Sequence, residues 1–305
     1  MQIFEVHQTA ERDRVVVSSP VESDSAPGAD WKGAWTSAIL DGKAVFIVGE
    51  GTSRVIRFEK MSDDGAVVLA GSATLPTEID AVFSFVAGDQ SYLATYRRAN
   101  GMFEFRRIGH DFTLSQPVAF RRTHEPAVTA GFTMVEAFEL ANAVAIMGYD
   151  HEGGRVAIYT VEVTARGENG APPIAVHTAW SHLWATGWTR FAFFDLGAEV
   201  FFLKTNDIWK NVNIDHINRG FADGTNEVDT HMALDDAYDL SHVAALTLDH
   251  GEPYFVAYRP DGHTTIYRIH ADCRGWTAVA QFDAMPGARG LVAWAGNGKR
   301  GIALR

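Results

Sequence analysis

The chain has 305 residues, of which 47% are hydrophobic and 21% charged, so it has enough apolar material for a large core and not the composition of a disordered protein. Its 26 lysines and arginines against 38 acidic residues give a formal net charge of −12, which argues against nucleic acid or an anionic membrane surface as the partner. The single cysteine, Cys273, excludes an intramolecular disulfide and a Cys/His zinc site.

A signal peptide has a basic segment followed by an apolar one, and the N-terminal stretch MQIFEVHQTAERDRVVV contains no such pair. No run of the chain approaches the roughly 18 uninterrupted apolar residues of a membrane-spanning helix. A lone cysteine is also typical of a reducing compartment. We therefore expect a cytoplasmic protein without a signal peptide or transmembrane segment.

Short alternating apolar runs bounded by Gly, Asp and Asn recur along the chain, and helical periodicity is almost absent, which predicts an all-β protein. One phrase repeats: an apolar strand, a tight turn, a second apolar strand that often ends in Tyr, a polar loop, and a third strand of the form aromatic-x-x-Ile. Its copies begin at Gly33, Asp80, Gly131, Gly187 and Ser241. The first turn of each unit is marked by Gly42, Gly88, Asn142, Gly197, Gly251 and Gly298, which lie 46 to 55 residues apart.

The sixth copy is incomplete, because only one strand, 299–304, follows Gly298. The N-terminus supplies what is missing: residues 1–7 resemble the third-strand segment 264–270, and residues 14–18 can add an outer strand. We therefore predict a six-bladed β-propeller whose sixth blade is closed by strands from both termini. A β-sandwich, or two small β-domains, is the alternative. The predicted single domain has approximate blades 33–79, 80–130, 131–186, 187–240, 241–289, and 290–305 plus 1–20.

The repeat resembles bacterial β-propellers built from a Gly-Trp-Thr…Gly…Tyr blade phrase and, more loosely, lectin-type propellers. These motifs pack the blades against each other, so the resemblance implies a fold and no particular function.

Ligands of single-chain propellers usually lie where the inner strands begin, on the face that also carries the loops between second and third strands. At the predicted starts of inner strands are Trp31, Glu78, His124, His182, Trp184, Asp239, His242 and Arg289. The loops of the same face carry Arg54, Arg97, Arg98, Asp150, His151, Trp209, Arg259 and His263. Loops are polar in any propeller, so such a collection also arises without a site.

Five of these residues are the predicted catalytic group. His182 and His242 are expected as base or metal ligands, Asp239 and Glu78 as the acid or second ligand, and Arg289 as an anion anchor. The predicted ligand-binding residues are Trp31, His124, His151, Trp184, Trp209, Arg259 and His263. A divalent metal is compatible with this set, but nothing in the sequence requires one.

The polar residues at the inner-strand starts differ from blade to blade, whereas a multivalent lectin repeats its binding residues in every blade. This favours one asymmetric site on the axis, in a central funnel, for a small polar ligand. Such a site fits an enzyme with His/Asp acid–base or metal-assisted chemistry, of lyase, isomerase, cyclase or hydrolase type. A glycan-binding propeller and a protein-interaction scaffold are the alternatives, and the oligomeric state stays open.

Overall fold

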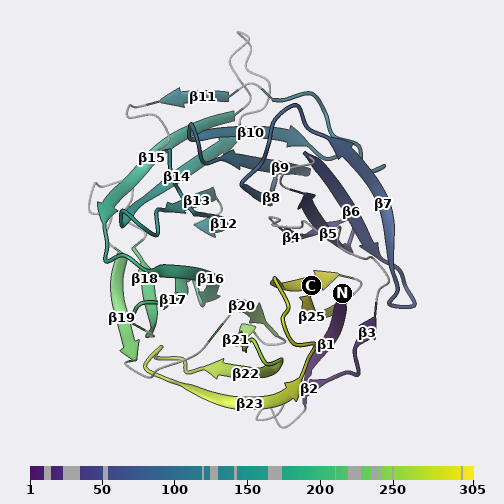
Figure 1. Cartoon of the computed structure of the whole chain (residues 1–305), viewed down its shortest axis with the longest axis vertical. Helices are drawn as coiled ribbons and strands as arrows, with labels where there is room; N and C mark the ends of the chain where they lie inside the picture. Colours follow the sequence, from purple (N-terminus) through teal and green to yellow (C-terminus); the bar gives the residue numbers. More distant parts are fainter. Residues whose placement is uncertain are drawn as a thin grey trace.

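The computed structural model describes residues 1–9, 15–22, 35–50, 54–118, 120–123, 130–140, 143–163, 174–209, 211–218, 228–234, 240, 242–248, 251–296 and 298–305. Their strands form six sheets arranged as blades around one axis (Figure 1). This confirms the predicted all-β, six-bladed propeller. No helix among the described residues is long and apolar enough to cross a membrane.

Three blades have four antiparallel strands in the order of the chain. Blade 1 is β4 (Trp35–Leu40), β5 (Lys43–Glu50), β6 (Val55–Met61) and β7 (Val67–Thr74). Blade 4 is β16 (Trp188–Leu196), β17 (Glu199–Asn206), β18 (Val212–Ile217) and β19 (Val228–Leu234). Blade 5 is β20 (His242–Thr247), β21 (Pro253–Tyr258), β22 (His263–Ile269) and β23 (Trp276–Asp283).

Blades 2 and 3 depart from the four-stranded pattern, with three and five strands respectively. Blade 2 is β8 (Ala81–Ala87), β9 (Gln90–Arg97) and β10 (Met102–Arg107). Blade 3 is β12 (Met134–Leu140), β13 (Ala143–Tyr149), β14 (Arg155–Val163) and β15 (Ile174–Leu183), with β11 (Phe120–Thr123) paired in parallel outside β15. Two isolated bridges, Phe105 with Val118 and Ile108 with Leu114, stand where blade 2 would have a fourth strand. Pro117, which has no N–H to donate, directly precedes Val118.

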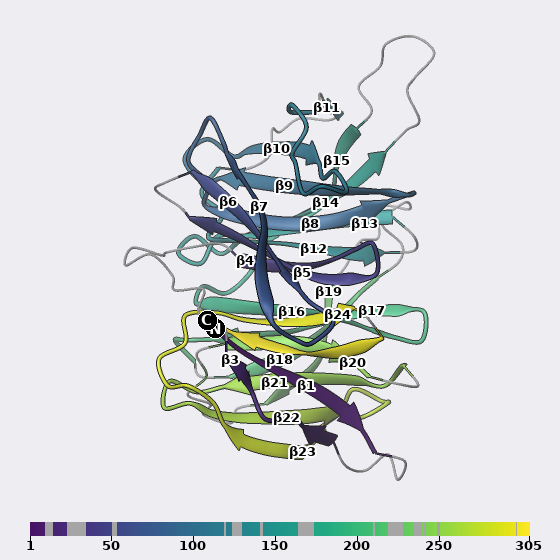
Figure 2. The same ribbon diagram turned by 90° about the vertical axis from the view of Figure 1, so that its right-hand side faces the viewer.

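Blade 6 joins the two ends of the chain, as predicted. It contains β24 (Leu291–Gly296), β25 (Lys299–Leu304), β1 (Gln2–Gln8), β2 (Val15–Val17) and β3 (Val21–Glu22). β1 and β25 are antiparallel, with Gln2 opposite Leu304 and Glu5 opposite Gly301, so the termini lie side by side (Figure 2). A Cβ on Gly301 would lie 1.9 Å from the Phe4 carbonyl oxygen, so this close approach of the two strands requires glycine.

The seam between blades 6 and 1 also contains an ion pair. Arg305 Nη1 lies 3.1 Å from Glu59 Oε2 on β6, and the two side chains are 1% and 3% exposed. The last residue of the chain is thereby held inside the ring. Because the charges are so well buried, removing either partner would leave the other in an unfavourable environment.

Hydrophobic clusters fill all six seams between neighbouring blades in the described structure. Buried residues from the two sides of each seam, in ring order from blades 1 and 2, are Phe58 and Leu93, Phe103 and Tyr159, Tyr149 and Phe202, Leu203 and Phe255, Tyr254 and Ile302, and Trp294 and Phe46. The apolar positions of the repeat therefore pack blade against blade, and the buried apolar residues that the structure describes are divided among these seams.

The tyrosine at the end of the second strand connects its blade to the next one. In blade 5 the Tyr258 hydroxyl donates to the Met285 carbonyl at 2.9 Å and accepts from the Ala288 N–H at 2.8 Å. Equivalent bonds join Phe132 N–H to the Tyr96 hydroxyl (3.1 Å), the Tyr149 hydroxyl to the Ala185 carbonyl (2.7 Å) and Trp188 N–H to the Tyr149 hydroxyl (3.4 Å). These bonds fix the position at which the next inner strand begins.

The predicted first turns of the units are also confirmed where the structure describes them. Gly42, Gly88, Gly197, Gly251 and Gly298 all have φ between +64° and +74°, a backbone conformation that favours glycine. Asn142 lies outside the described residues.

Replacing Phe4 by alanine tests whether β1 is an integral strand of blade 6. Phe4 is 2% exposed and packs on Phe282 at 4.8 Å between ring centroids. We expect Phe4→Ala to lower the free energy of unfolding by about 3–5 kcal/mol, measured by urea denaturation. Val16→Ala, on the exposed side of β2, is the control and should cost under about 0.5 kcal/mol. Equal effects of the two substitutions would contradict the closure of the ring by β1.

Candidate functional site

The inner strands of blades 6, 1 and 2 form an uncharged side of the axis. Their sequences, LVAWAG in β24, WTSAIL in β4 and AVFSFVA in β8, contain no ionisable residue. Serine hydroxyls connect them: Ser37 donates to the Ala293 carbonyl at 2.6 Å, and Ser84 donates to the Ser37 carbonyl at 3.3 Å. The two serine hydroxyls are thus satisfied by backbone carbonyls of the neighbouring inner strands.

The inner strands of blades 3, 4 and 5 form a charged side of the axis. β12 (MVEAFEL), β16 (WTRFAFFDL) and β20 (HVAALT) contribute Glu136, Arg190 and His242 near the ends where the strands begin. Glu139 and Asp195 lie near the opposite ends. We call Glu136, Arg190 and His242 the axial triad.

A break in the strand register accompanies Arg190. The pairing of β16 with β17 shifts between Trp188 and Arg190, so Thr189 has no partner in the ladder. The other five inner hairpins keep an uninterrupted register over their described residues. The Thr189 hydroxyl donates to Asp207 Oδ1 at 2.9 Å, and Arg190 Nη1 donates to the Thr189 carbonyl at 2.6 Å. β-Bulges of this kind redirect a side chain next to functional sites.

Arg190 interacts electrostatically with both other members of the triad. Burial among the inner strands raises the pKa of Glu136 to about 7, although the Arg190 charge opposes the rise. The Glu136 side chain is nevertheless exposed to solvent, so water reduces the effect of the surrounding protein on its pKa. Burial also lowers the pKa of Arg190, while Asp207 and Glu136 counteract this effect.

His242 is held neutral at physiological pH. Burial and then the Arg190 charge lower the pKa of His242 to about 4, against a smaller opposing effect of the hydrogen bond to Ala288. His242 Nε2 lies 3.2 Å from the Ala288 carbonyl oxygen, which can only accept, so Nε2 carries the proton and Nδ1 is the acceptor nitrogen. Near pH 7 the triad therefore combines a carboxyl of raised pKa, a cation and a neutral imidazole.

The structure separates most of the predicted catalytic residues. His242 is in the axial triad. Arg289 directly follows Ala288, whose carbonyl oxygen lies 3.2 Å from His242 Nε2, and the Arg289 backbone N–H donates to the Arg305 carbonyl at 2.5 Å. Glu78 is exposed in the connection between β7 and β8 and lines a different pocket. Asp239, Trp31 and His124 lie outside the described residues.

The expected position of His182 at the start of an inner strand is wrong. His182 is exposed on β15, the strand of blade 3 that pairs outside β14, where it is opposite Val156. The cause is that β15 continues to Leu183, and the next inner strand begins only at Trp188. His182 is thus separated from the axis by the width of its blade.

The predicted ligand-binding residues also spread over several blades. Trp184 packs inside the seam of blades 3 and 4, stacked on Phe202 at 5.9 Å, with the Lys204 ammonium 4.2 Å from its ring. Lys204 is in turn paired with the buried Asp215. His151 lies near the beginning of β16, with Nδ1 3.4 Å from the Trp188 carbonyl oxygen.

The remaining predicted residues are on the rim. Trp209 is 70% exposed in the turn after β17. Arg259 is exposed in the turn after β21, and His263 Nδ1 lies 3.5 Å from Asp283 Oδ1 on β23, away from the inner strands. No group of three or more His, Cys, Asp or Glu among the described residues is arranged to hold a metal ion.

Glu136 and Arg190 were not among the predicted residues, although the sequence contains a signal for them. Charged residues interrupt the apolar inner strands of blades 3 and 4 and are absent from those of blades 6, 1 and 2. Sequence reasoning that considers only the residues before each strand overlooks this difference.

The whole chain is similar in fold to several solved propellers. A candidate 6-phosphogluconolactonase from Bacteroides fragilis matches with a TM-score of 0.53 and 11% identity, covering 96% of this chain and 86% of its own. A second candidate 6-phosphogluconolactonase, from Bacteroides uniformis, matches with a TM-score of 0.52 and 11% identity over 95% and 84% of the two chains. BBS1N, solved in complex with ARL6DN, matches with a TM-score of 0.52 and 9% identity over 93% and 96%.

These likenesses show the propeller fold and nothing finer. No protein-family model and no curated protein matches the chain.

The pH dependence of stability tests the environment of Glu136. Because the folded chain holds this proton more tightly than an ordinary carboxyl of pKa 4.5, its stabilising contribution is complete below about pH 4.5 and is lost as the pH rises through about 7. We expect Glu136→Gln to be more stable than the native chain by about 1 kcal/mol at pH 8, after allowance for solvent screening, and similar at pH 4. Glu139→Gln is the control, and parallel stability curves of the native chain and Glu136→Gln would contradict the raised pKa.

His242 has the opposite effect on stability. Its folded pKa of about 4 lies below the ordinary 6.5, so its contribution is present above about pH 6.5 and is lost as the pH falls towards 4. We expect His242→Gln to lose about 2 kcal/mol less than the native chain between pH 7 and pH 4. Urea denaturation at each pH measures this difference, with the exposed His270→Gln as control. If the stability of His242→Gln falls between pH 7 and pH 4 by as much as that of the native chain, the lowered pKa of the imidazole is wrong.

Proposed function

We propose that this protein is an enzyme that binds one small, polar, anionic substrate at the axis and moves a proton with Glu136. The observation that carries the proposal is the restriction of ionisable inner-strand residues to blades 3, 4 and 5, with the triad at the ends where these strands begin. One asymmetric group of this kind fits one central ligand, whereas a repeated lectin site needs the same residues in every blade.

Each member of the triad has a distinct chemical role in the proposal. Arg190 remains a cation and binds a carboxylate or an oxyanion that develops during the reaction. Glu136, with its pKa of about 7, is well matched to give or take a proton at neutral pH. His242 is neutral, and its Nδ1 accepts a hydrogen bond from a substrate hydroxyl or an attacking water.

Hydrolysis is the reaction type that we would examine first. Glu136 in its ionised form takes a proton from water, the hydroxyl oxygen adds to a lactone or ester carbonyl, and Arg190 stabilises the resulting oxyanion. Glu136 then returns the proton to the leaving oxygen. Two of the similar folds bear the name of a lactone hydrolase, which supports the choice of substrates at the level of fold analogy. The buried, free Cys273 agrees with a cytoplasmic location, which is part of this proposal.

Steady-state assays with a panel of small lactones and esters, including 6-phosphogluconolactone, test the proposal. We expect hydrolysis above the buffer rate, a kcat that falls about 10²- to 10⁴-fold in Glu136→Gln, and a pH profile with a midpoint near 7 that this substitution abolishes. Arg190→Gln should raise KM as well as lower kcat. Glu139→Gln, at the other end of the same inner strand, should keep full activity.

The alternatives predict different outcomes. The proposal is wrong if no member of the panel is hydrolysed and none shows binding that is lost in Arg190→Gln. Saturable binding to a glycan array at several equivalents per chain would favour a lectin. Co-purification of one partner protein in stoichiometric amount would favour a scaffold, provided that substitution of exposed rim residues such as Trp209 abolishes it.

A further inference from the structure

An open pocket of about 1080 Å³ lies on the seams between blades 1, 2 and 3, at the face where the inner strands begin. It shares no residue with the axial triad. Its charged lining residues are Arg54, Arg97, Arg98, Arg155, Glu78 and Asp80. Four guanidinium groups thus face two carboxylates in a chain whose formal net charge is −12.

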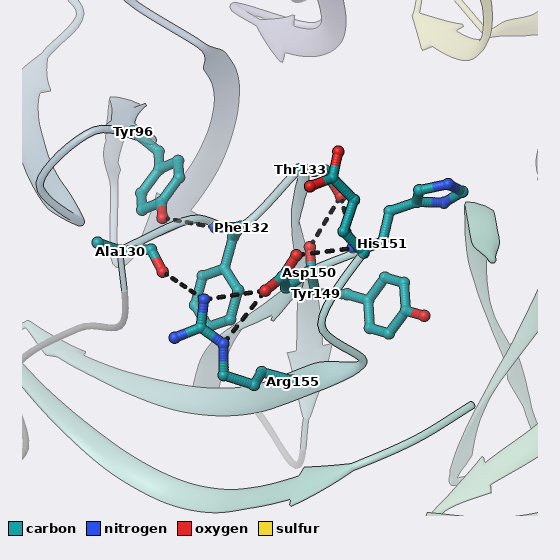
Figure 3. Close-up of polar contacts among 9 residues, drawn as sticks. Tyr96, Ala130, Phe132, Thr133, Tyr149, Asp150, His151 and Arg155 are labelled. Atoms are coloured by element: carbon teal, nitrogen blue, oxygen red, sulfur yellow. Dashed lines mark hydrogen bonds and ion pairs between the residues drawn. The ribbon is translucent and has the colours of Figure 1, made fainter. Parts of the chain in front are cut away.

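Two of the arginines are held by fixed acceptors. Arg155 Nη2 donates to Asp150 Oδ2 at 2.9 Å and to the Ala130 carbonyl at 3.2 Å, as Figure 3 shows. Arg54 Nη1 donates to the Pro76 carbonyl at 3.1 Å. Burial by itself raises the pKa of Asp150, but hydrogen bonds from Arg155 and from two backbone N–H groups outweigh it and hold the pKa below its usual range. Asp150 therefore stays ionised and keeps Arg155 in place.

The turn that carries Arg98 is bonded to residues 130–132, which in turn contact Arg155 through the Ala130 carbonyl. Gly131 N–H donates to the Arg98 carbonyl at 2.9 Å. Phe132 N–H donates to the Tyr96 hydroxyl at 3.1 Å, as Figure 3 shows. Gly131 has a φ of +95°, and a Cβ there would lie 2.8 Å from Arg155 Nη2. Glycine at this position therefore lets the guanidinium lie against the turn.

The other two arginines keep their donors available. Arg97 and Arg98 form no ion pair with any residue that the structure describes. Asp80 Oδ2 accepts the backbone N–H of Arg98 at 2.7 Å rather than a guanidinium donor of either arginine. Guanidinium groups brought together in this way repel one another unless an anion lies between them.

We propose that this pocket is an anion site that binds a small molecule through a phosphate monoester group. The planar donor pairs of arginine match phosphate oxygens, and two negative charges on the phosphate offset the excess of cationic side chains. The pocket has the size of a small-molecule cleft. Its position between three blades means that the ligand also bridges the seams of the ring.

Isothermal titration of the full chain with inorganic phosphate, against chloride at the same ionic strength, tests the site. We expect saturable binding, weakened about tenfold by Arg97→Ala and about tenfold by Arg98→Ala, because each removes a charge-assisted hydrogen bond. Glu78→Gln should strengthen binding about threefold by removing a repelling carboxylate. Arg259→Ala, an exposed arginine of the same face outside the pocket, should bind phosphate like the native chain.

Arg98→Lys keeps the charge without the planar donor pair and should bind with intermediate affinity. Thermal unfolding of each variant shows that the fold is retained, which we expect because neither Arg97 nor Arg98 makes an ion pair in the described structure. If phosphate binds with a Kd above about 10 mM, which corresponds to less than about 3 kcal/mol of binding free energy, the proposal is wrong. Equal binding by the native chain and a variant lacking both arginines would also overturn it.

Discussion

The antiparallel pairing of β1 with β25 is the interaction on which the rest of the structure depends. It converts two chain ends into the middle of blade 6, completes the hydrophobic seams on both sides of that blade, and leaves no inner strand without neighbours. Glycine at position 301 permits the strands to approach, and the Arg305–Glu59 pair holds the last residue against blade 1. Because the ring is closed, residues far apart in sequence keep fixed positions around one axis.

The repeat and the site use different parts of each blade. The repeated residues, such as the Tyr149 and Tyr258 hydroxyls, fix where the next inner strand starts and leave its polar residues free to vary. Blades 6, 1 and 2 use this freedom to join their inner strands by serine hydrogen bonds, whereas blades 3, 4 and 5 place Glu136, Arg190 and His242 there. The asymmetry that function requires is thus compatible with a regular scaffold.

The repeat pattern was sufficient to predict the fold, the closure at the termini and the glycine turns, because packing between blades imposes the same apolar spacing on every unit. It also placed His242 correctly at the start of an inner strand. It failed at His182, because an outer strand and the connection after it have similar polar composition and the sequence does not mark where β15 ends. It could not locate Arg190, whose direction depends on a register shift at Thr189 that interrupts a period of two. The raised pKa of Glu136 arises from burial among the assembled inner strands, and the opposing charge of Arg190 comes from another blade, so local sequence patterns contain neither effect.

Glu136 and Arg190 on the charged side of the axis are coupled through their charges. A ¹³C NMR titration of the Glu136 side-chain carboxyl, assigned by comparison with Glu136→Gln, measures this coupling. We expect a midpoint near pH 7 in the native chain and a higher midpoint in Arg190→Gln, because the opposing cation is then absent. A midpoint near the ordinary 4.5 that does not respond to the loss of Arg190 would contradict it.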